Sequence, residues 1–416
     1  MLLRILILII ALLALPDAYI YIMYIKRWTR CLWARLLWFA PSLILAATAA
    51  AIISSNDMKA DHQAWVSYFM IAFLGICAPK TLFMLFDAIG HSINWTVTRG
   101  AKKISFIKEG IFIRTMRMVG MTTALIGTLI LCFGYFVGRH HYVIHRRTIY
   151  FDDLPEQFDG YKIAQFSDMH IGTLRDGHEQ DARAMVDIIN QQHCDAIMFT
   201  GDLVNHESAE LDGFRRDLSR LHAPDGVYAV MGNHDYSMYL HYCSEKERLA
   251  DVRELQRRIT SYGWTLLLNE HKILRRGNDS LIIAGTENDG RPPFPARADM
   301  PKTMCGLRRD CFTILLTHDP TAWRRKVLRT TGIQLTLSGH THAGQFYLFG
   351  WSPVANVYKE WSGAYSIGNR WINVSNGIGA VMFPFRFGAW PEVNVITLRR
   401  NKAPKSVTQV KNDNTQ

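Results

Sequence analysis

Four long apolar stretches in about the first third of the chain restrict its fold more than any other feature of the sequence. They cover about residues 2–25, 36–53, 65–86 and 119–137. Because a membrane-spanning helix needs about 20 mostly apolar residues, each stretch is long enough to cross a bilayer. The first is followed by basic residues and by no cleavage site of small residues, so we expect it to be retained rather than removed as a signal peptide. The sequence therefore predicts a transmembrane region with about four helices over residues 1–140.

The third apolar stretch contains two residues that are unusual in a membrane helix, Pro79 and Lys80. Proline removes a backbone hydrogen bond and bends a helix, so this stretch either kinks or forms a re-entrant segment. A lysine at membrane depth can mark a functional site. Near the end of a helix, however, its ammonium group reaches the interface, and this is the placement that we expect for Lys80.

Basic residues predict how the chain crosses the membrane. The formal net charge is +11, and lysines and arginines gather after the first apolar stretch and before the fourth. Because such loops stay in the cytoplasm, the N-terminus and the chain after residue 139 are expected on the opposite side. We therefore expect a multi-pass protein of the cell (inner/cytoplasmic) membrane whose second half is extracytoplasmic. That half contains no basic stripe with interleaved aromatic residues, so no specific nucleic-acid partner is expected.

The second half of the sequence is typical of a soluble α/β domain over about residues 148–400. A polar tail at residues 401–416 is expected to be disordered. The seven cysteines show no CxxC spacing, which argues against a zinc–thiolate site or a disulfide framework. Cys305 and Cys311 are close in sequence and either pair in an oxidising compartment or remain two free thiols.

Short β-branched runs recur from residue 161 onward, and each ends in a cluster of polar residues. Helical patterns at residues 178–191 and 245–260 alternate with these runs, which predicts an α/β layered domain. In open α/β sheets, ligands bind beyond the carboxyl ends of the strands, and the polar clusters fall at these ends. The clusters are Asp168-Met169-His170, Gly201-Asp202, Gly232-Asn233-His234-Asp235, His318-Asp319 and Gly339-His340-Thr341-His342.

Several side chains in these clusters are oxygen or nitrogen donors of the kind that hold divalent cations. A single such residue is more often an ordinary strand-end side chain, but five motifs in this order rarely coincide by chance. A carboxylate can bridge two ions, and glycines beside the donors let the backbone turn sharply. The sequence therefore predicts a site for two divalent metal ions. The candidate ligands are Asp168, His170, Asp202, Asn233, His318, His340 and His342.

In their order, these motifs resemble the calcineurin-like metallophosphoesterase superfamily over about residues 148–400. The run Gly339-His340-Thr341-His342-Ala343-Gly344-Gln345 is similar to its membrane-associated bacterial branch, which includes UDP-2,3-diacylglucosamine hydrolase-like and transmembrane metallophosphoesterases; Ala343 stands where a glycine is usual. The resemblance implies N-terminal transmembrane helices followed by a four-layer α/β/β/α sandwich. It assigns one metal ion to Asp168, His170, Asp202 and His342. It assigns the other to Asp202, Asn233, His318 and His340, so that Asp202 is shared.

The resemblance also implies a role for His234, which would not bind metal, and the position of Asp235 beside it in the sequence suggests another. His234 would lie over the substrate phosphate as a general acid or charge stabiliser, and Asp235, the next residue, is expected to orient it. Two metal ions lower the pKa of a shared water, so a metal-bridging hydroxide would attack phosphorus without a side-chain base. Ligands of this type suit manganese, zinc or iron better than magnesium.

The membrane tether favours a lipid-linked phosphodiester, phosphomonoester or pyrophosphate as the substrate. Some relatives of this branch hydrolyse UDP-2,3-diacylglucosamine, a cytoplasmic nucleotide sugar that conflicts with the expected orientation. Two other functions stay open: a broad phosphatase or nuclease acting on soluble esters, and a membrane sensor with a vestigial site. Candidate phosphate ligands are Arg291, Arg370 and Arg386.

Two aromatic runs follow the last metal motif. They form either an apolar rim for acyl chains or part of the core of the second sheet. The runs contain Trp351, Tyr358, Trp361 and Tyr365, and then Phe383, Phe385, Phe387 and Trp390.

Overall fold

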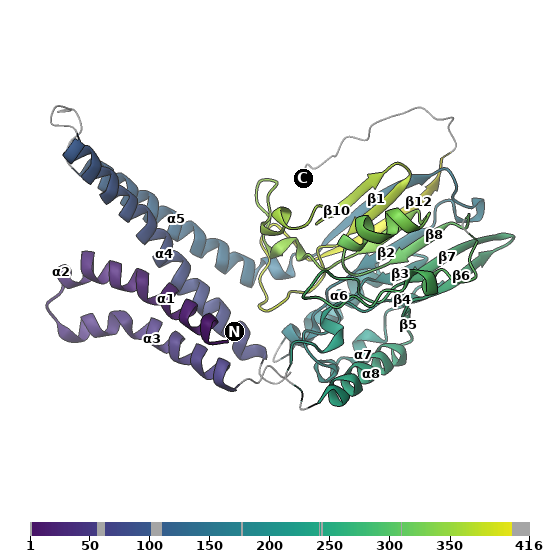
Figure 1. Ribbon diagram of the computed structural model, residues 1–416, viewed down its shortest axis with the longest axis horizontal. Coiled ribbons are helices and arrows are strands. Elements are labelled where there is room, and N and C mark those ends of the chain that lie inside the picture. Colours follow the sequence, from purple (N-terminus) through teal and green to yellow (C-terminus); the bar gives the residue numbers. More distant parts are fainter. Residues whose placement is uncertain are drawn as a thin grey trace.

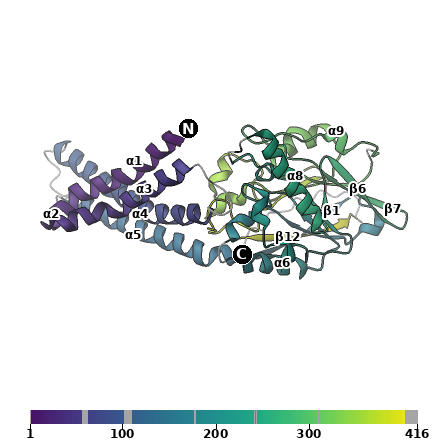
Figure 2. The ribbon, with the colours of Figure 1, turned by 90° about the horizontal axis from the view of Figure 1, so that it is seen from below.

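The computed structural model describes residues 2–55, 63–100, 110–175, 178–240, 242, 244–308 and 310–401 of the 416-residue chain. A bundle of long helices and an α/β part lie next to each other along the long axis of the molecule (Figure 1). The same division is visible from below (Figure 2). The predicted tail, apart from Asn401, and most of the second basic loop lie outside the described residues.

Four helices of the bundle are long and apolar enough to cross a membrane, which confirms the predicted number. They are α1 (Leu2–Ile20), α3 (Leu32–Ser55), α4 (Gln63–Gly100) and α5 (Ile111–Phe136). A π-helical turn (Tyr21–Ile25) and the short helix α2 (Lys26–Trp28) extend α1. The 38 residues of α4 span about 57 Å at about 1.5 Å per residue. This helix is therefore longer than predicted and exceeds the roughly 30 Å hydrocarbon core of a bilayer.

The middle of α4 differs from what the sequence suggested. The helix continues through Pro79, which excludes a re-entrant segment. Lys80 lies midway along α4 rather than near its end, and its Nζ is 2.6 Å from Oδ1 of Asp17 in α1 and 3.4 Å from Oγ of Ser42 in α3. Lys80 therefore pairs with a buried carboxylate inside the bundle, and its expected placement at the membrane interface stays a prediction.

Two six-stranded sheets form the centre of the α/β part. The first has the strand order β1-β12-β2-β3-β4-β5 and the second β10-β11-β9-β8-β7-β6. The strands of the first are β1 (Val143–Phe151), β2 (Lys162–Phe166), β3 (Ala196–Phe199), β4 (Val227–Ala229), β5 (Thr265–Leu266) and β12 (Glu392–Arg400). Those of the second are β6 (Glu270–Arg276), β7 (Asp279–Gly285), β8 (Thr313–Leu316), β9 (Leu335–Ser338), β10 (Gly363–Ile367) and β11 (Arg370–Val374). Because β2, β3 and β4 are mutually parallel, as are β7, β8 and β9, their carboxyl ends share an edge in each sheet.

Apolar side chains fill the space between the two sheets and the space outside each of them. Successive residues of a strand point to opposite faces, so Ile163 of β2 faces the second sheet while Ala164 faces the outer helices. The outer face of the first sheet packs with helices α6 (Glu179–Asn190), α7 (Arg215–Leu218) and α8 (Glu245–Ser261). The second sheet packs with α9 (Met300–Thr303), a helical turn (Trp323–Val327) and α10 (Leu328–Thr330). This arrangement is the predicted four-layer sandwich.

One of the contacts between the helical bundle and the α/β part is at residues 381–390. The ring of Phe133 in α5 lies 6.1 Å from that of Phe387, measured between centroids. Ser67 of α4 donates a hydrogen bond from Oγ to the carbonyl oxygen of Met382 over 3.0 Å. The alternative that this second aromatic run packs in the core of the second sheet is therefore wrong. The run packs on the membrane helices instead.

Two alternatives that the sequence left open are decided by the structure. Cys305 and Cys311 are two free thiols, and Cys305 is exposed. Tyr365, from the earlier aromatic run, does pack against the core of the second sheet.

Candidate metal centre

The candidate ligands gather where strands of both sheets end. Loops after β2, β3 and β4 carry the residues from the first sheet, and loops after β8 and β9 carry those from the second. All are buried except His340, which is partly exposed. These residues are Asp168, His170, Asp202, Asn233, His318, His340 and His342.

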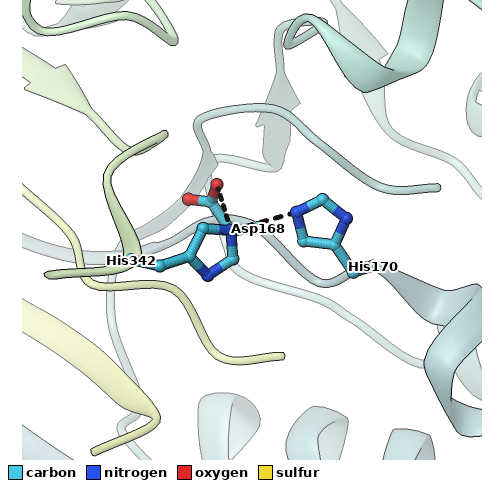
Figure 3. Close-up of side chains that lie close together, drawn as sticks. All are labelled: Asp168, His170 and His342. Atoms are coloured by element: carbon cyan, nitrogen blue, oxygen red, sulfur yellow. Dashed lines mark hydrogen bonds and ion pairs between the residues drawn. The ribbon is translucent and has the colours of Figure 1, made fainter. Parts of the chain in front are cut away.

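One group consists of Asp168, His170 and His342 (Figure 3). Nε2 of His342 lies 3.2 Å from Oδ1 of Asp168 and 3.0 Å from Nε2 of His170. The three side chains come from β2 and β9, and so from different sheets, yet their donor atoms point toward one another. This convergence fits the ligands of a cation better than three ordinary strand ends.

A second group consists of Asp202, His318 and His340. Oδ2 of Asp202 lies 3.0 Å from Nε2 of His318 and 3.8 Å from Nε2 of His170 in the first group. Nδ1 of His340 lies 3.3 Å from Nε2 of His318. The Asp202 carboxylate therefore stands between the two groups, as a bridging ligand would.

Asn233 supplies a test of whether a cation fits this arrangement. Its Nδ2 donates to the Tyr239 hydroxyl over 2.8 Å, but its Oδ1 is buried and has no hydrogen-bond partner among the described residues. A buried amide oxygen without a partner is costly, and a cation would satisfy it. The donor set also contains only carboxylate, amide and imidazole groups, which suits hard or borderline divalent metals.

The backbone at the site is strained in a way that points to function. Five of the seven candidate ligands have positive φ angles between 46° and 77°, in the left-handed region that L-residues rarely adopt. Each such residue costs about 1–2 kcal/mol, and strain of this kind collects at functional sites. The five are Asp168, His170, Asp202, His340 and His342.

Two glycines make the convergence possible. A Cβ atom on Gly232 would collide with the Asp202 carboxylate, and one on Gly339 would collide with Asp168 and with Ser167. Only glycine therefore allows the loops to approach the two carboxylates this closely.

Without a cation, most of the candidate histidines are neutral. Burial lowers the pKa of His170, His340 and His342, that of His340 to about 4. Burial also disfavours the charged form of His318, but the Asp202 carboxylate raises its pKa to about 10. Among these four imidazoles, only that of His318 has to release a proton when a cation binds.

Comparisons with known proteins agree with this geometry. Residues 161–344 match the family model described as calcineurin-like phosphoesterase, and residues 3–139 match a probable transmembrane domain of calcineurin-like phosphoesterases. The chain is 33% identical to the uncharacterized metallophosphoesterase YkuE of Bacillus subtilis, over 59% of this chain and 82% of that protein. This chain belongs to the calcineurin-like metallophosphoesterase family. It is therefore a metal-dependent phosphoester hydrolase.

Two further relatives also match the helical bundle. A transmembrane protein with metallophosphoesterase domain from Danio rerio is 26% identical, over 81% of this chain and 74% of its own length. An uncharacterized metallophosphoesterase of Helicobacter pylori (strain J99) is 27% identical, over 86% of this chain and 88% of its own length. Both alignments are longer than the α/β part, so the likeness to these relatives extends into the helical bundle.

His234 lies beside the metal centre of the metallophosphoesterase. Its Nδ1 donates to the carbonyl oxygen of Asn205 over 2.6 Å, and its ring lies 4.8 Å from that of His170. Because a carbonyl oxygen only accepts, the proton of a neutral His234 ring is on Nδ1 and Nε2 has a free lone pair. The donor atoms of His170, Asp202 and His234 also lie close enough to share a cation, so the geometry fits either a catalytic or a ligand role.

Asp235 does not have the role that the sequence suggested. Its two carboxylate oxygens accept hydrogen bonds from the backbone N–H groups of Asp202, Leu203, Val204 and Gly232, over 2.8–3.2 Å. Asp235 therefore joins the loop after β3 to the loop after β4 rather than orienting the His234 ring. Burial raises its pKa to about 7.

Two of the three candidate phosphate-binding arginines serve the fold instead. Arg386 is fully buried and donates to the carbonyl oxygens of Gly379 and His342, and over 2.9 Å to Nδ1 of the His342 ring. Arg370 donates to the carbonyl oxygens of residues 327, 328 and 333. The expectation is therefore wrong for these two, while Arg291 is exposed and stays a prediction.

Three residues near the metal centre had no signal in the sequence. Oδ1 of Asn205 lies 2.7 Å from Nδ1 of His170. The Tyr358 hydroxyl lies 2.9 Å from Nε2 of His340, and the ring of Tyr239 lies 4.5 Å from that of His234. Tyr358 belongs to a predicted aromatic run, but nothing in that run distinguished it from its neighbours.

Proposed function

We propose that this metallophosphoesterase holds two divalent cations, with the ligands divided as the family resemblance implies. Asp168, His170 and His342 hold one and Asn233, His318 and His340 the other, with Asp202 shared between them. The position of Oδ2 of Asp202, 3.0 Å from His318 and 3.8 Å from His170, is the observation that carries this proposal. The catalytic domain comprises residues 148–400, and residues 1–140 form its membrane region.

The protein's own residues supply the remaining chemistry. Cations held by these ligands would supply the nucleophile, because metal coordination lowers the pKa of water to near neutrality. With Nδ1 donating to Asn205, the other ring nitrogen of His234 carries a second proton when the ring is an imidazolium, and in that form it can give this proton to the leaving oxygen or stabilise its charge. The intact donor set argues against a vestigial site.

The substrate that the architecture favours is a phosphoester linked to an apolar chain. A cavity of about 410 Å³ lies between α4, α5 and the loop that follows His342. Its lining is almost entirely apolar and includes Leu82 of α4, Ile130 of α5 and Phe346 beyond His342. An acyl chain could enter this cavity from the bilayer while its phosphate reaches the metal centre.

The charge distribution supports an extracytoplasmic catalytic domain. The connection from α1 to α3 lies at the end of the bundle away from the sheets (Figure 1). This connection contains Arg27 and Arg30, and the nearby beginning of α5 contains Arg114 and Arg117. Because basic residues remain in the cytoplasm, the sheets would lie on the other side. With single-cysteine variants in intact cells, an impermeant maleimide should then label exposed Cys305 but not exposed Cys31, and the opposite pattern would reverse the assigned orientation.

The substrate class is tested by comparing a lipid phosphodiester in micelles with a soluble aryl phosphodiester, each with manganese, zinc or iron. Gly127→Leu fills the cavity, whose wall includes Gly127. Gly75→Leu is its control, because Gly75 lies on α4 and a Cβ there meets nothing within 4 Å. We expect Gly127→Leu to slow hydrolysis of the lipid and to leave hydrolysis of the aryl ester unchanged. The control Gly75→Leu should change neither rate. Equal loss on both substrates, or no loss on either, would favour a broad phosphatase acting on soluble esters.

A further inference from the structure

Gln63, the first residue of α4, reaches from the helical bundle into the α/β part. Its side chain is buried, with 6% of the residue exposed. Nε2 of Gln63 donates to Oε1 of Glu210 over 2.5 Å, and Oε1 of Gln63 accepts a hydrogen bond from Nδ2 of Asn205 over 2.7 Å. Gly172 makes room for this contact, because a Cβ there would collide with both Gln63 and Glu210.

Asn205 connects these hydrogen bonds to the metal centre. Its Oδ1 lies 2.7 Å from Nδ1 of His170, and its backbone carbonyl oxygen accepts a hydrogen bond from Nδ1 of His234 over 2.6 Å. One residue thus contacts both a candidate metal ligand and the candidate general acid. Partners of this kind fix the orientation of a ligating histidine and raise its affinity for metal.

Glu210 determines the direction of each hydrogen bond in the series that runs from Glu210 through Gln63 and Asn205 to His170. Both of its oxygens accept backbone N–H bonds, from Asn205 over 2.6 Å and from His206 over 2.7 Å. Burial raises the pKa of Glu210 to about 7, so above this pH the group is mostly a carboxylate. A carboxylate only accepts, so the amide nitrogen of Gln63 must face Glu210 and its oxygen must face Asn205. The amide nitrogen of Asn205 then faces Gln63, and its oxygen faces His170. The His170 proton is therefore held on Nδ1, which leaves the lone pair of Nε2 for a cation.

We propose that Gln63 is a positioning residue of the metal centre: acting through Asn205, it holds His170 in the metal-binding tautomer. The affinity of the site for a cation then depends on how α4 is seated against the α/β part. The membrane bundle is in this way a component of the catalytic site as well as an anchor. The inference rests on the proposed ligand role of His170.

The test measures Mn²⁺ affinity of the full-length protein directly, by titration calorimetry and by the electron paramagnetic resonance signal of the bound ion. Gln63→Met keeps the size of the side chain but removes both hydrogen bonds. Ser67→Ala is the matched control, because Ser67 lies one turn further along α4 and also bonds to the α/β part, but at Met382 and away from the metal centre. We expect Gln63→Met to weaken Mn²⁺ binding about tenfold and Ser67→Ala to leave it unchanged.

A double-mutant cycle shows whether the effect passes through Asn205. Asn205→Ala should weaken binding at least as much as Gln63→Met, and adding Gln63→Met to Asn205→Ala should have no further effect. Melting temperatures of all variants report loss of stability separately. Unchanged affinity in Gln63→Met, a fully additive double variant, or an equal loss in Ser67→Ala would overturn the proposal.

This readout also separates the inference from the proposed function. Wild-type protein that binds Mn²⁺ but hydrolyses neither test ester would contradict the proposed substrates and still test Gln63. Wild-type protein that binds no divalent cation would overturn both.

Discussion

Raising the pH from about 7.5 to about 8.5 is expected to strengthen Mn²⁺ binding about tenfold. The magnitude follows from the number of protons that the cation displaces, since each displaced proton contributes about one unit to the slope of log affinity against pH. Asp202 raises the pKa of His318 to about 10, so its ring keeps a proton throughout this range until a cation displaces it. The other three candidate histidines have lowered pKa values and are already neutral.

The expected slope is therefore about one, although the site contains four histidines. The pH range lies above about 7 because Asp235 and Glu210, each with a pKa of about 7, are then mostly ionised and add little to the slope. Calorimetric titrations in buffers of different ionisation enthalpy count the released protons independently. A slope near zero would mean that His318 is neutral before binding, and a slope of two or more would mean that further imidazoles are protonated. Either result would refute the electrostatics described for the site.

Three substitutions test separate parts of the site. His234→Ala should lower turnover about 100-fold while metal content, measured by mass spectrometry, stays near that of the wild type; loss of one ion would instead make His234 a ligand. Asp202→Ala should lose both ions, because its carboxylate lies between the two groups, and retention of two would contradict bridging. Asp235→Asn puts an amide NH₂ in place of an oxygen that accepts two backbone N–H bonds. At about 1.5–3 kcal/mol for each bond to a charged group, it should cost about 4 kcal/mol and lower the melting temperature by roughly 10 °C, whereas a drop below about 2 °C would contradict this role.

The convergence of the candidate ligands could be predicted because it depends on local features of the chain. Each polar cluster follows a short buried strand, and parallel strands bring their carboxyl ends to one edge. Asp168 and His342 are 174 positions apart in the sequence, yet both follow strands whose pattern is plain. The position of a residue could therefore be predicted from the sequence where it depends only on the strand that the residue follows.

The partners of these ligands could not be predicted because they depend on contacts between distant segments. Asn205 and Gln63 are separated by 142 positions, and no periodicity relates a membrane helix to a loop of the sheet. Asp235 illustrates the opposite error, in which nearness in sequence suggested a contact. His234–Tyr236 form a 3₁₀ turn, in which consecutive side chains point about 120° apart. Asp235 therefore points toward the backbone of the neighbouring loop and not along the His234 ring.

Prediction of the membrane region from the sequence was limited by the same difference between local and long-range information. Average hydropathy identifies four helices because it depends only on neighbouring residues, but it cannot say which charged residues meet. Asp87 is fully buried in α4 and accepts hydrogen bonds from Tyr24 of the extended first helix over 2.5 Å and from Arg117 of α5 over 3.2 Å. Lys80 meets Asp17 in the same way. Because a paired charge can stay within a bundle where a single charge would move to the interface, the contact of Lys80 with α1 depends on its partner and not on its own surroundings in the sequence.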